Sequence, residues 1–235
     1  MKLKDKIIVI TGASDGIGKQ IALRLAKENT RLALIARDKK RLTEVSKLSK
    51  QLGAAEVKIY LCDICKTKKL EKTVKDIVSY FGSIDILINN AGIWQKINPL
   101  EKIKKDIVDE IIGTNLTGLI HITKLFLPVL KKQKESAIIN VSSRSGIVPQ
   151  EGQSVYSASK YGVKGFTDVL KIDLKSTNVK VAGVYQGGTN TRMFAKTGDN
   201  FPTDNFTEPA DLADVVVYML SRPAKIWLPE VHIER

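Results

Sequence analysis

The sequence predicts an α/β fold in which helices cover both faces of a parallel sheet. Apolar runs rich in Val and Ile alternate along the chain with longer amphipathic segments, as expected when parallel strands are buried on both faces by their connecting helices. A glycine-rich turn joins the first strand pattern to the first helix pattern, which is typical of a doubly wound sheet. The 235 residues suit one such domain, so we expect a single domain over residues 1–235.

The individual elements follow from hydrophobic periodicity, with strands in the short apolar runs and helices in the gaps. We predict seven strands, at residues 6–11, 31–36, 57–61, 84–89, 136–141, 179–184 and 226–233. We predict helices at residues 17–29, 39–52, 66–81, 154–176 and 209–221, and an interrupted helix over residues 100–132. The segment 186–207 has no periodicity and is too long for an ordinary connection, so we expect a substrate lid there.

The formal net charge of +13 would suit a nucleic acid or another anionic surface as a partner. The lysines are scattered over helix patterns, and no basic run is interleaved with aromatic residues. A solvated surface is therefore the preferred interpretation, and no nucleic-acid partner is expected. A basic field would also assist the capture of a polyanionic dinucleotide.

Composition disfavours several other classes of protein. No apolar stretch reaches the roughly 18 residues of a membrane-spanning helix, and the apolar run at residues 7–10 is too short for the core of a signal peptide. We therefore expect a soluble, cytoplasmic protein without a membrane partner. Two cysteines, Cys62 and Cys65, are too few for a disulfide framework. Because they lie far in sequence from His121 and His232, no metal site is expected either. A redox role for the two thiols is disfavoured because they follow a strand pattern instead of opening a helix.

The glycine-rich turn Thr11-Gly12-Ala13-Ser14-Asp15-Gly16-Ile17-Gly18 predicts a dinucleotide site. Gly12 permits the tight turn, Gly16 lets the backbone approach a pyrophosphate, and Gly18 lets the helix pack on the strand. The helix N-terminus supplies free N–H groups and the positive end of a dipole for the phosphates. A compact turn without a ligand is the structural alternative. The expected cofactor contacts in this turn are Gly12, Ser14, Asp15, Gly16, Ile17 and Gly18.

The end of the second strand pattern, Ala36-Arg37, bears on which dinucleotide binds. An acidic residue there would accept hydrogen bonds from the ribose 2′-hydroxyl, whereas an arginine favours a 2′-phosphate through a charge-assisted bidentate contact. Arg37 therefore predicts NADP(H) in preference to NAD(H). Asp38 and Asp15 add opposing charge nearby, so NAD(H) stays as the alternative.

Tyr156 and Lys160 are four residues apart in a helix pattern, so both side chains project from one face of that helix. An ammonium beside a phenol stabilises the phenolate, which would lower the tyrosine pKa and suit a proton donor to a nascent alkoxide. For this pair alone, a helix surface without function would be the simpler interpretation. Ser143, however, follows a strand at the carboxyl edge, where open α/β sheets bind ligands. Its hydroxyl is suited to hydrogen-bond a carbonyl oxygen.

With these motifs in the same order and spacing, the chain resembles the short-chain dehydrogenase/reductase family, the compact single-domain type, along essentially its whole length. The resemblance implies a Rossmann fold with seven strands in the order 3-2-1-4-5-6-7. It also implies a homodimer or homotetramer, with the helices after Asn115 and Tyr156 at the subunit seam. The residues that carry the likeness are Thr11 to Gly18, Asp63, Ile64, Asn89 to Gly92, Asn115, Ser143, Tyr156 and Lys160.

The resemblance also assigns roles to single residues. Tyr156 would be the general acid and base, and Lys160 would lower its pKa and bind the nicotinamide ribose. Ser143 would orient the substrate carbonyl, and Asn115 would hold a water in the proton relay. The other implied cofactor contacts are Asp63 and Ile64 at the adenine, Asn89, Ala91 and Gly92 after the fourth strand, and Gly187, Thr189 and Thr191 after the sixth.

The chain departs from the family pattern at two places. Gln186 stands where the family usually has a proline, so we expect a looser turn after the sixth strand. Asp15 occupies the position of the basic residue that NADP(H)-dependent members usually carry in the glycine turn. The second departure weakens the prediction of NADP(H) but leaves the predicted chemistry unchanged.

Together these features predict an NADPH-dependent oxidoreductase that reduces a ketone or aldehyde, such as a 3-oxoacyl compound, to an alcohol. The first alternative is an NAD-dependent alcohol or hydroxy-acid dehydrogenase on the same fold. The second is a non-catalytic cofactor-sensing or nucleic-acid-associated protein. Predicted substrate contacts are Trp94, Ser143, Gln150 and Phe194.

Overall fold

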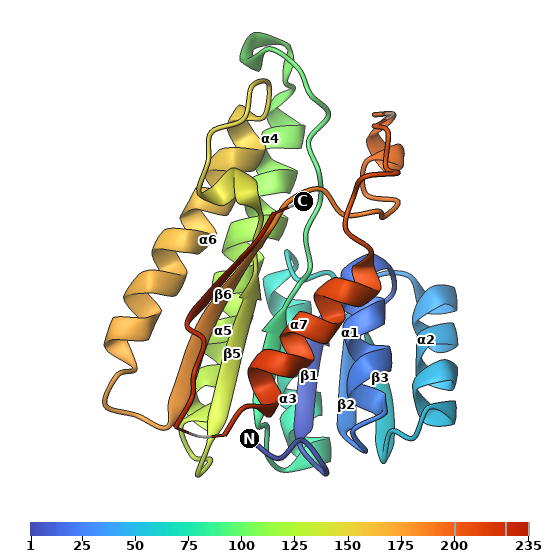
Figure 1. Cartoon of the computed structure of the whole chain (residues 1–235), viewed down its shortest axis with the longest axis vertical. Helices are drawn as coiled ribbons and strands as arrows, with labels where there is room; N and C mark the ends of the chain where they lie inside the picture. The colour runs from blue at the N-terminus through green and yellow to red at the C-terminus, as the bar shows by residue number, and fades with distance from the viewer. Residues whose placement is uncertain (200, 224, 235) are drawn as a thin grey trace.

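The computed structural model describes residues 1–199, 201–223 and 225–234. Its centre is a seven-stranded parallel sheet in the order β3-β2-β1-β4-β5-β6-β7 (Figure 1), which confirms the predicted fold class and strand order. The strands are β1 (Ile7–Thr11), β2 (Arg31–Ala36), β3 (Glu56–Leu61), β4 (Ile86–Asn89), β5 (Ser136–Val141), β6 (Val179–Gln186) and β7 (Glu230–Ile233). The α-helices are α1 (Gly16–Ala26), α2 (Lys39–Gln51), α3 (Thr67–Phe81), α4 (Lys105–Ile112), α5 (Gly118–Leu130), α6 (Ser154–Asp173) and α7 (Pro209–Ser221).

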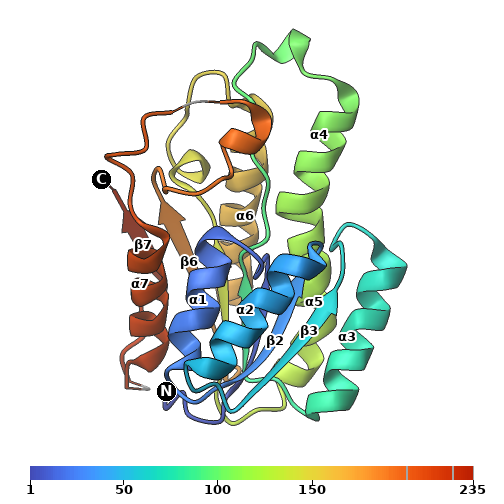
Figure 2. The same ribbon diagram turned by 90° about the vertical axis from the view of Figure 1, so that its right-hand side faces the viewer.

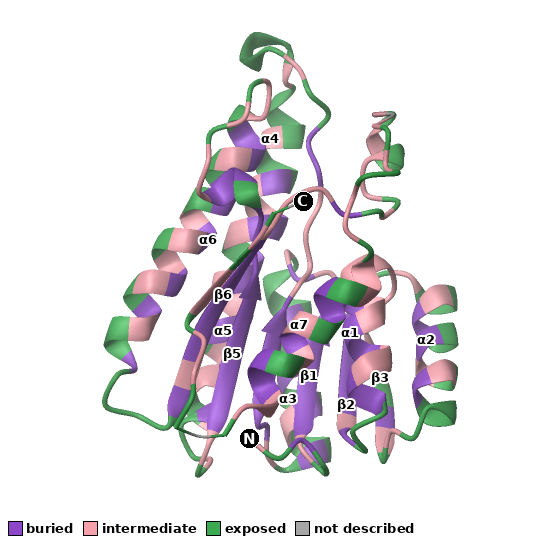
Figure 3. Cartoon of the chain, in the orientation of Figure 1, coloured by how far each residue is buried: buried purple, intermediate pink, exposed green. Residues whose placement is uncertain are grey.

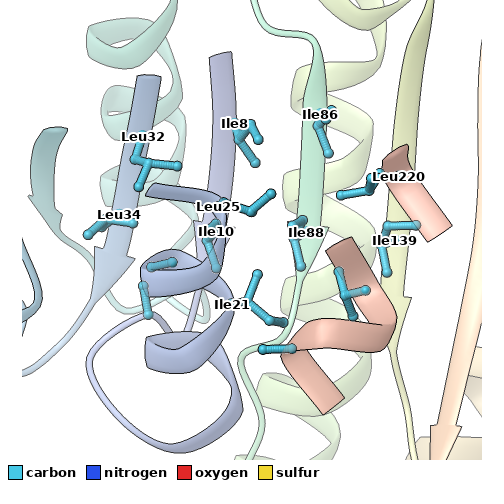
Figure 4. Packing of buried hydrophobic residues seen from close by; sticks show 14 of the residues in the cluster. Ile8, Ile10, Ile21, Leu25, Leu32, Leu34, Ile86, Ile88, Ile139 and Leu220 are labelled. Atoms are coloured by element: carbon cyan, nitrogen blue, oxygen red, sulfur yellow. The ribbon is translucent and has the colours of Figure 1, made fainter. Parts of the chain in front are cut away.

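Two hydrophobic layers enclose the sheet, because successive side chains of a strand point to opposite faces. In β1, Ile8 and Ile10 pack with α1, α2 and α7, whereas Ile7 and Val9 pack with α3, α5 and α6. Figure 4 shows the first layer, in which Ile8 and Ile10 lie near Ile88 of β4. The central strands are buried along their length (Figure 3), so the apolar runs of the sequence are explained by burial on both faces.

The carboxyl ends of the strands share one edge of the molecule, and α4 rises beyond that edge (Figures 1 and 2). The N-terminus lies at the opposite edge. Open α/β sheets bind ligands outside the carboxyl ends of their strands, so this edge is where a site is expected. Within the described ranges, no helix is long and apolar enough to cross a membrane.

Some predicted boundaries differ from the structure for local reasons. The first helix ends at Ala26 instead of residue 29, because Asn29 has a φ of 56°, in the left-handed region that interrupts a helix. The last strand begins at Glu230 instead of residue 226, because Pro229 has no N–H to donate to a sheet. The sixth strand extends beyond residue 184 to Gln186. The remaining predicted boundaries lie within three residues of the observed ones.

The interrupted helix predicted over residues 100–132 has four parts. A 3₁₀ turn, η1 (Leu100–Lys102), precedes α4, and a π-helical turn, η2 (Gly113–Thr117), joins α4 to α5. Asn115 lies within this π turn and is 1% exposed. Short π-helical insertions often occur at functional sites, which agrees with the role that the family resemblance implies for Asn115.

Candidate active site

A cleft of about 1240 Å³ lies at the carboxyl edge of the sheet. Pockets for one drug-sized ligand measure roughly 300–1,000 Å³, so this cleft has room for more than one ligand. Most of the predicted site residues line the cleft, and the exceptions are Gly18, Asn89 and Asn115. Those that line it are Gly12, Ser14, Asp15, Gly16, Ile17, Arg37, Asp63, Ile64, Ala91, Gly92, Trp94, Ser143, Gln150, Tyr156, Lys160, Gly187, Thr189, Thr191 and Phe194.

Two turns form the floor of one half of the cleft, the glycine turn after β1 and the turn after β4. The Thr11 hydroxyl accepts hydrogen bonds from the backbone N–H groups of Asn90 and Ala91, both at 3.0 Å. Gly12 has a φ of 66°, and a Cβ atom on it would lie 2.8 Å from the Ala91 Cα. Only glycine therefore fits at this position, because both the backbone conformation and the close approach exclude a side chain.

Gly18 supports this floor from within α1. A Cβ atom on Gly18 would lie 2.4 Å from the side-chain nitrogen of Asn90 and 2.4 Å from the Gly12 carbonyl oxygen. The predicted close packing is therefore present, but its partners are the two turns. Gly18 is buried behind the cleft lining, so its packing role is visible in the structure, while its contact with a cofactor stays a prediction.

Asp15 joins three segments that are distant in sequence. Its Oδ1 accepts the Gly16 N–H at 3.0 Å, as an N-cap side chain does. Its Oδ2 lies 2.8 Å from the guanidinium of Arg192, 3.4 Å from that of Arg41 and 3.5 Å from the Lys196 ammonium. Partial burial opposes ionisation, but the hydrogen bonds from Arg192 and Gly16 and the nearby cations hold the pKa of Asp15 below its usual range.

The end of β2 places two arginines at the cleft. Arg37 lines it, with 57% of its side chain exposed, and its Nη1 lies 4.0 Å from Asp63 and 3.8 Å from Glu110. Arg41, one helical turn further along, also lines the cleft, and its backbone N–H donates to Asp38 at 3.0 Å. Arg37 was predicted from the sequence, but Arg41 was not. Its place in the first turn of the helix predicted directly after the second strand was the signal that could have found it.

Ser143, Tyr156 and Lys160 meet at the other half of the cleft. The Lys160 ammonium lies 5.6 Å from the centre of the Tyr156 ring, and the Ser143 hydroxyl hydrogen-bonds with the Tyr156 side chain. The three residues are 9%, 4% and 6% exposed in chain order. They are thus shielded from bulk water while still lining the cleft.

Two further hydrogen bonds hold these groups in place. The Ser143 hydroxyl accepts the Ser145 N–H at 3.1 Å. Gln95 accepts the Tyr156 N–H at 2.8 Å through Oε1 and donates to the Gly152 carbonyl at 3.0 Å. An N–H in the first turn of a helix has no partner within that helix, so Gln95 supplies one. No local pattern could have identified Gln95, because it is 61 residues from Tyr156.

Burial shifts the pKa values of the two ionisable groups away from their ordinary values. It raises the pKa of Tyr156 to about 12, against the opposing effect of the Ser143 hydrogen bond, and lowers the pKa of Lys160 to about 8. Loss of solvation penalises the charged form of each group. Burial is thus the dominant effect on Tyr156 in the chain by itself, and the role of Lys160 in lowering the Tyr156 pKa stays a prediction. Near neutral pH, Tyr156 is a protonated phenol, which is the form that donates a proton.

Asn115 lies behind Gly92 and does not face the cleft. Its Oδ1 accepts the Ile93 N–H at 2.8 Å, and its amide donates to the Ile93 carbonyl at 3.0 Å and to the Ser159 hydroxyl at 3.1 Å. A Cβ atom on Gly92 would lie 3.3 Å from the Asn115 Oδ1 and 3.5 Å from the Lys160 Nζ. Asn115 thus braces the residues around Lys160, and its role in a water relay stays a prediction.

The Asn89 side chain lies in the core, and the predicted contact of this residue with a cofactor stays a prediction. Its side-chain nitrogen donates to Thr123 at 2.8 Å and to Asn140 at 2.9 Å, and the residue is 2% exposed. These hydrogen bonds connect β4 with α5 and β5. The next residue, Asn90, lines the cleft instead, because successive residues of a strand point to opposite sides.

The backbone after β6 is held by β7, so the expectation of a looser turn is wrong. Gln186 pairs with Ile233 in the sheet, and the Gly187 N–H donates to the Ile233 carbonyl at 2.9 Å. Gln186 also lines the cleft, and its buried Oε1 has no hydrogen-bond partner among the described residues. A buried acceptor of this kind is costly unless a ligand satisfies it. A nicotinamide carboxamide carries a matching N–H donor, so Gln186 and the glycine turn fit a nicotinamide dinucleotide.

Aromatic side chains dominate the wall beside Tyr156. The Trp94 ring centroid lies 4.6 Å from that of Tyr156 and 5.0 Å from that of Phe194. Phe201 and Phe206, which the sequence analysis did not single out, also line the cleft. The predicted contacts of Trp94, Gln150 and Phe194 with a substrate stay predictions. Residue 200 of the predicted lid lies outside the described residues.

The sequence pattern of the short chain dehydrogenase family matches residues 6–201 of the chain. The chain belongs to the short-chain dehydrogenase family. It is therefore an oxidoreductase, an enzyme that acts on CH–OH or C=O groups.

Similar proteins agree with this assignment to the short-chain dehydrogenases. An uncharacterized oxidoreductase of Staphylococcus epidermidis is 33% identical, over 99% of this chain and 98% of the relative. A 3-oxoacyl-[acyl-carrier-protein] reductase of Thermotoga maritima is 32% identical, over 94% and 92% of the two chains. The alcohol dehydrogenase of Thermococcus sibiricus, solved with 5-hydroxy-NADP, superposes with a TM-score of 0.89 at 27% identity, covering 97% and 96%.

Proposed function

We propose that this short-chain dehydrogenase is an NADPH-dependent reductase of ketones or aldehydes. The observation that carries the proposal is the meeting of Ser143, Tyr156 and Lys160 in the same cleft as the glycine turn. Two hydroxyl groups and one ammonium at the end of a dinucleotide-sized cleft are the groups that carbonyl reduction requires. The similarity to a 3-oxoacyl-[acyl-carrier-protein] reductase supports reduction as the direction.

Each catalytic side chain has a distinct task in the proposed reaction. The Ser143 hydroxyl donates a hydrogen bond to the substrate carbonyl oxygen and stabilises the negative charge that develops there. Tyr156, protonated near neutral pH because its pKa is about 12, transfers its proton to that oxygen. The reduced dinucleotide, when bound, supplies the hydride for the carbonyl carbon. Lys160 provides positive charge behind the phenol, which stabilises the phenolate left after the proton transfer.

The preference for NADP(H) rests on Arg37 and Arg41. Both line the cleft at the end of β2, where a guanidinium pairs well with a 2′-phosphate. The NADP analogue in the Thermococcus sibiricus enzyme agrees with this choice. Asp63 and Glu110 near Arg37 are the observation that keeps an NAD-dependent dehydrogenase as the second candidate, since acidic side chains repel a 2′-phosphate.

The proposal is tested by following NADPH absorbance with a panel of ketones and aldehydes, and by comparing KM for NADPH and NADH. We expect Arg37→Ala to raise KM for NADPH about 10- to 100-fold, because one hydrogen-bonded charge pair with the 2′-phosphate is lost. KM for NADH, which has no 2′-phosphate, should change little. Lys39→Ala is the matched control, since Lys39 is an exposed neighbouring cation outside the cleft lining. An enzyme that binds neither dinucleotide and turns over no carbonyl compound would refute the proposal.

We also propose that the enzyme is a homodimer or homotetramer. Apolar side chains are exposed on the outer face of α6, with Tyr161, Val169 and Ile172 at 42%, 56% and 72%. Exposed apolar side chains on one helix favour association with another copy. Light scattering measures the mass directly, and a monomer of 26.0 kDa would contradict this part of the proposal.

A further inference from the structure

Four aromatic rings form one continuous surface in the cleft, here called the aromatic wall. Trp94, from the segment after β4, meets Phe194 at 5.0 Å and Phe201 at 6.2 Å between ring centroids, both edge to face. Phe194 in turn meets Phe201 at 5.0 Å and Phe206 at 5.7 Å. All four residues line the cleft, so the wall combines one residue from the β4 side with three from the lid.

The aromatic wall begins at the catalytic phenol. The Trp94 ring lies 4.6 Å from the Tyr156 ring, inclined at 62°. A carbonyl oxygen that contacts the Tyr156 and Ser143 hydroxyls therefore has its immediate substituents beside Trp94. The wall therefore meets the atoms bonded directly to the carbonyl carbon first.

The polar groups of Trp94, Thr197 and Gln95, which lie beside the wall, are paired within the protein. The Trp94 indole N–H donates to Asp199 at 2.7 Å, and the Thr197 hydroxyl donates to the same carboxylate at 3.1 Å. The Gln95 amide bonds Tyr156 and Gly152. Substituents placed here therefore meet aromatic carbon, and hydroxyl or thioester groups would lose their hydrogen bonds to water without replacement.

We propose that the substrate is an apolar ring compound whose carbonyl lies within the ring or is bonded directly to it, that is, a cyclic or aryl ketone or an aryl aldehyde. The inference rests on the proposed function and narrows it to one class. A ring can join the edge-to-face pattern of the wall, because aromatic pairs favour centroid separations of roughly 4.5–7 Å. Sugars and open-chain 3-oxoacyl thioesters would put polar groups against the same rings.

The test compares 1-tetralone, an aryl cyclic ketone, with acetoacetyl-N-acetylcysteamine, an open-chain 3-oxoacyl thioester. We expect kcat/KM to be higher for 1-tetralone. Phe201→Leu and Phe194→Leu, which keep an apolar side chain but remove a ring, should each lower kcat/KM for 1-tetralone about 3- to 10-fold, the value of one aromatic pair. The loss of kcat/KM for the thioester should be smaller than that for 1-tetralone, because the thioester has no ring to pair with the wall. Tyr218→Leu, at an exposed position of α7 outside the cleft, is the control.

A binding measurement gives a readout independent of turnover. The chain has two tryptophans, so Trp227→Phe leaves Trp94 as the only indole. With NADP⁺ present, titration of 1-tetralone should change Trp94 fluorescence in a saturable manner, and the thioester should change it little at the same concentrations. Preference for the thioester, or equal losses for both substrates in the leucine variants, would overturn the ring proposal while the reductase proposal stands. Absence of any carbonyl turnover would refute both.

Discussion

The glycine turn and the lid face the same cleft, but they keep their positions by different physical means. The glycine turn is held by buried backbone contacts, with Thr11 bonding Asn90 and Ala91 at 3.0 Å and glycine at each point of close approach. The predicted lid is tied at its ends by backbone hydrogen bonds, such as that from the Thr207 N–H to the Gly188 carbonyl at 3.0 Å. Its middle is held by side-chain contacts, such as the 2.8 Å ion pair between Arg192 and Asp15 and the aromatic wall. Backbone atoms therefore define the cleft surface at the glycine turn, whereas side chains define the surface that the predicted lid contributes.

This difference predicts that the two halves of the cleft tolerate substitutions to different degrees. A surface made of close backbone contacts tolerates few substitutions, because an added methyl group must displace its neighbours. A surface made of side chains changes its specificity through single substitutions while the fold is kept. We therefore expect the half of the cleft at the glycine turn to tolerate fewer substitutions than the half at the aromatic wall.

The largest effect is expected where the two surfaces meet, at Tyr156. We predict that Tyr156→Phe lowers kcat by about 10²- to 10⁴-fold, the usual contribution of a general acid. Affinity for NADPH and the midpoint of thermal unfolding should change little, because the ring and its packing stay. Tyr161→Phe, at an exposed position of the same helix, is the control. Turnover that survives in Tyr156→Phe would remove the catalytic role.

The backbone-defined surface is tested by adding one methyl group. A Cβ atom on Gly18 would lie 2.4 Å from the Gly12 carbonyl oxygen, so we predict that Gly18→Ala lowers the free energy of unfolding by about 1–3 kcal/mol and weakens NADPH binding. At Gly165, in the middle of α6, a Cβ atom would meet nothing within 4 Å. Gly165→Ala should therefore stabilise the protein, by about 0.5–1 kcal/mol. Urea unfolding measures both variants, and equal effects would contradict the distinction.

Lys160 gives a prediction about pH, because burial lowers its pKa from 10.5 to about 8. Between these values the unfolded chain binds more protons than the folded chain, so the contribution of Lys160 to stability rises with pH across this window. Lys160→Met removes that dependence. At pH 7 the variant should be more stable relative to the wild type than it is at pH 10.5. The free energy of unfolding of the variant minus that of the wild type should be larger at pH 7 by on the order of 2–3 kcal/mol.

Denaturant titrations at a series of pH values measure this difference without cofactor. Lys175→Met, at an exposed position after α6, is the control for loss of a positive charge. A difference that is independent of pH would show that Lys160 is solvated in the folded protein.

The smallest effect is expected at the lid. The Arg192 side chain is 54% exposed, and exposed ion pairs contribute about 1 kcal/mol or less. We predict that Arg192→Ala leaves global stability unchanged but raises the rate of chymotrypsin cleavage in the lid about two- to five-fold. Added salt should accelerate cleavage of the wild type and have less effect on the variant. Lys105→Ala, which removes the exposed pair with Asp109 on α4, should leave the cleavage rate unchanged.

Much of the fold and part of the site could be predicted because their signals are short in sequence. Short apolar runs marked the strands, and the glycine turn and the Tyr156–Lys160 spacing each lie within eight residues or fewer. The orientation of the Asn89 side chain and the hydrogen bonding after Gln186 could not be predicted, for a common reason. Each depended on which way a side chain or backbone group faces at the end of a strand, and that is decided by the neighbouring strand.

The sequence by itself determined the order of elements, and it predicted the backbone-defined half of the cleft and the catalytic side chains, because each depends on neighbours a few residues apart. Only the tertiary structure decided the direction of the Tyr156 and Lys160 pKa shifts, the bracing by Gln95 and the assembly of the aromatic wall. These properties depend on desolvation and on contacts such as that between Trp94 and Asp199, which are 105 residues apart. Such contacts exist only once the chain has folded, since burial is a property of the whole packing and of no single segment.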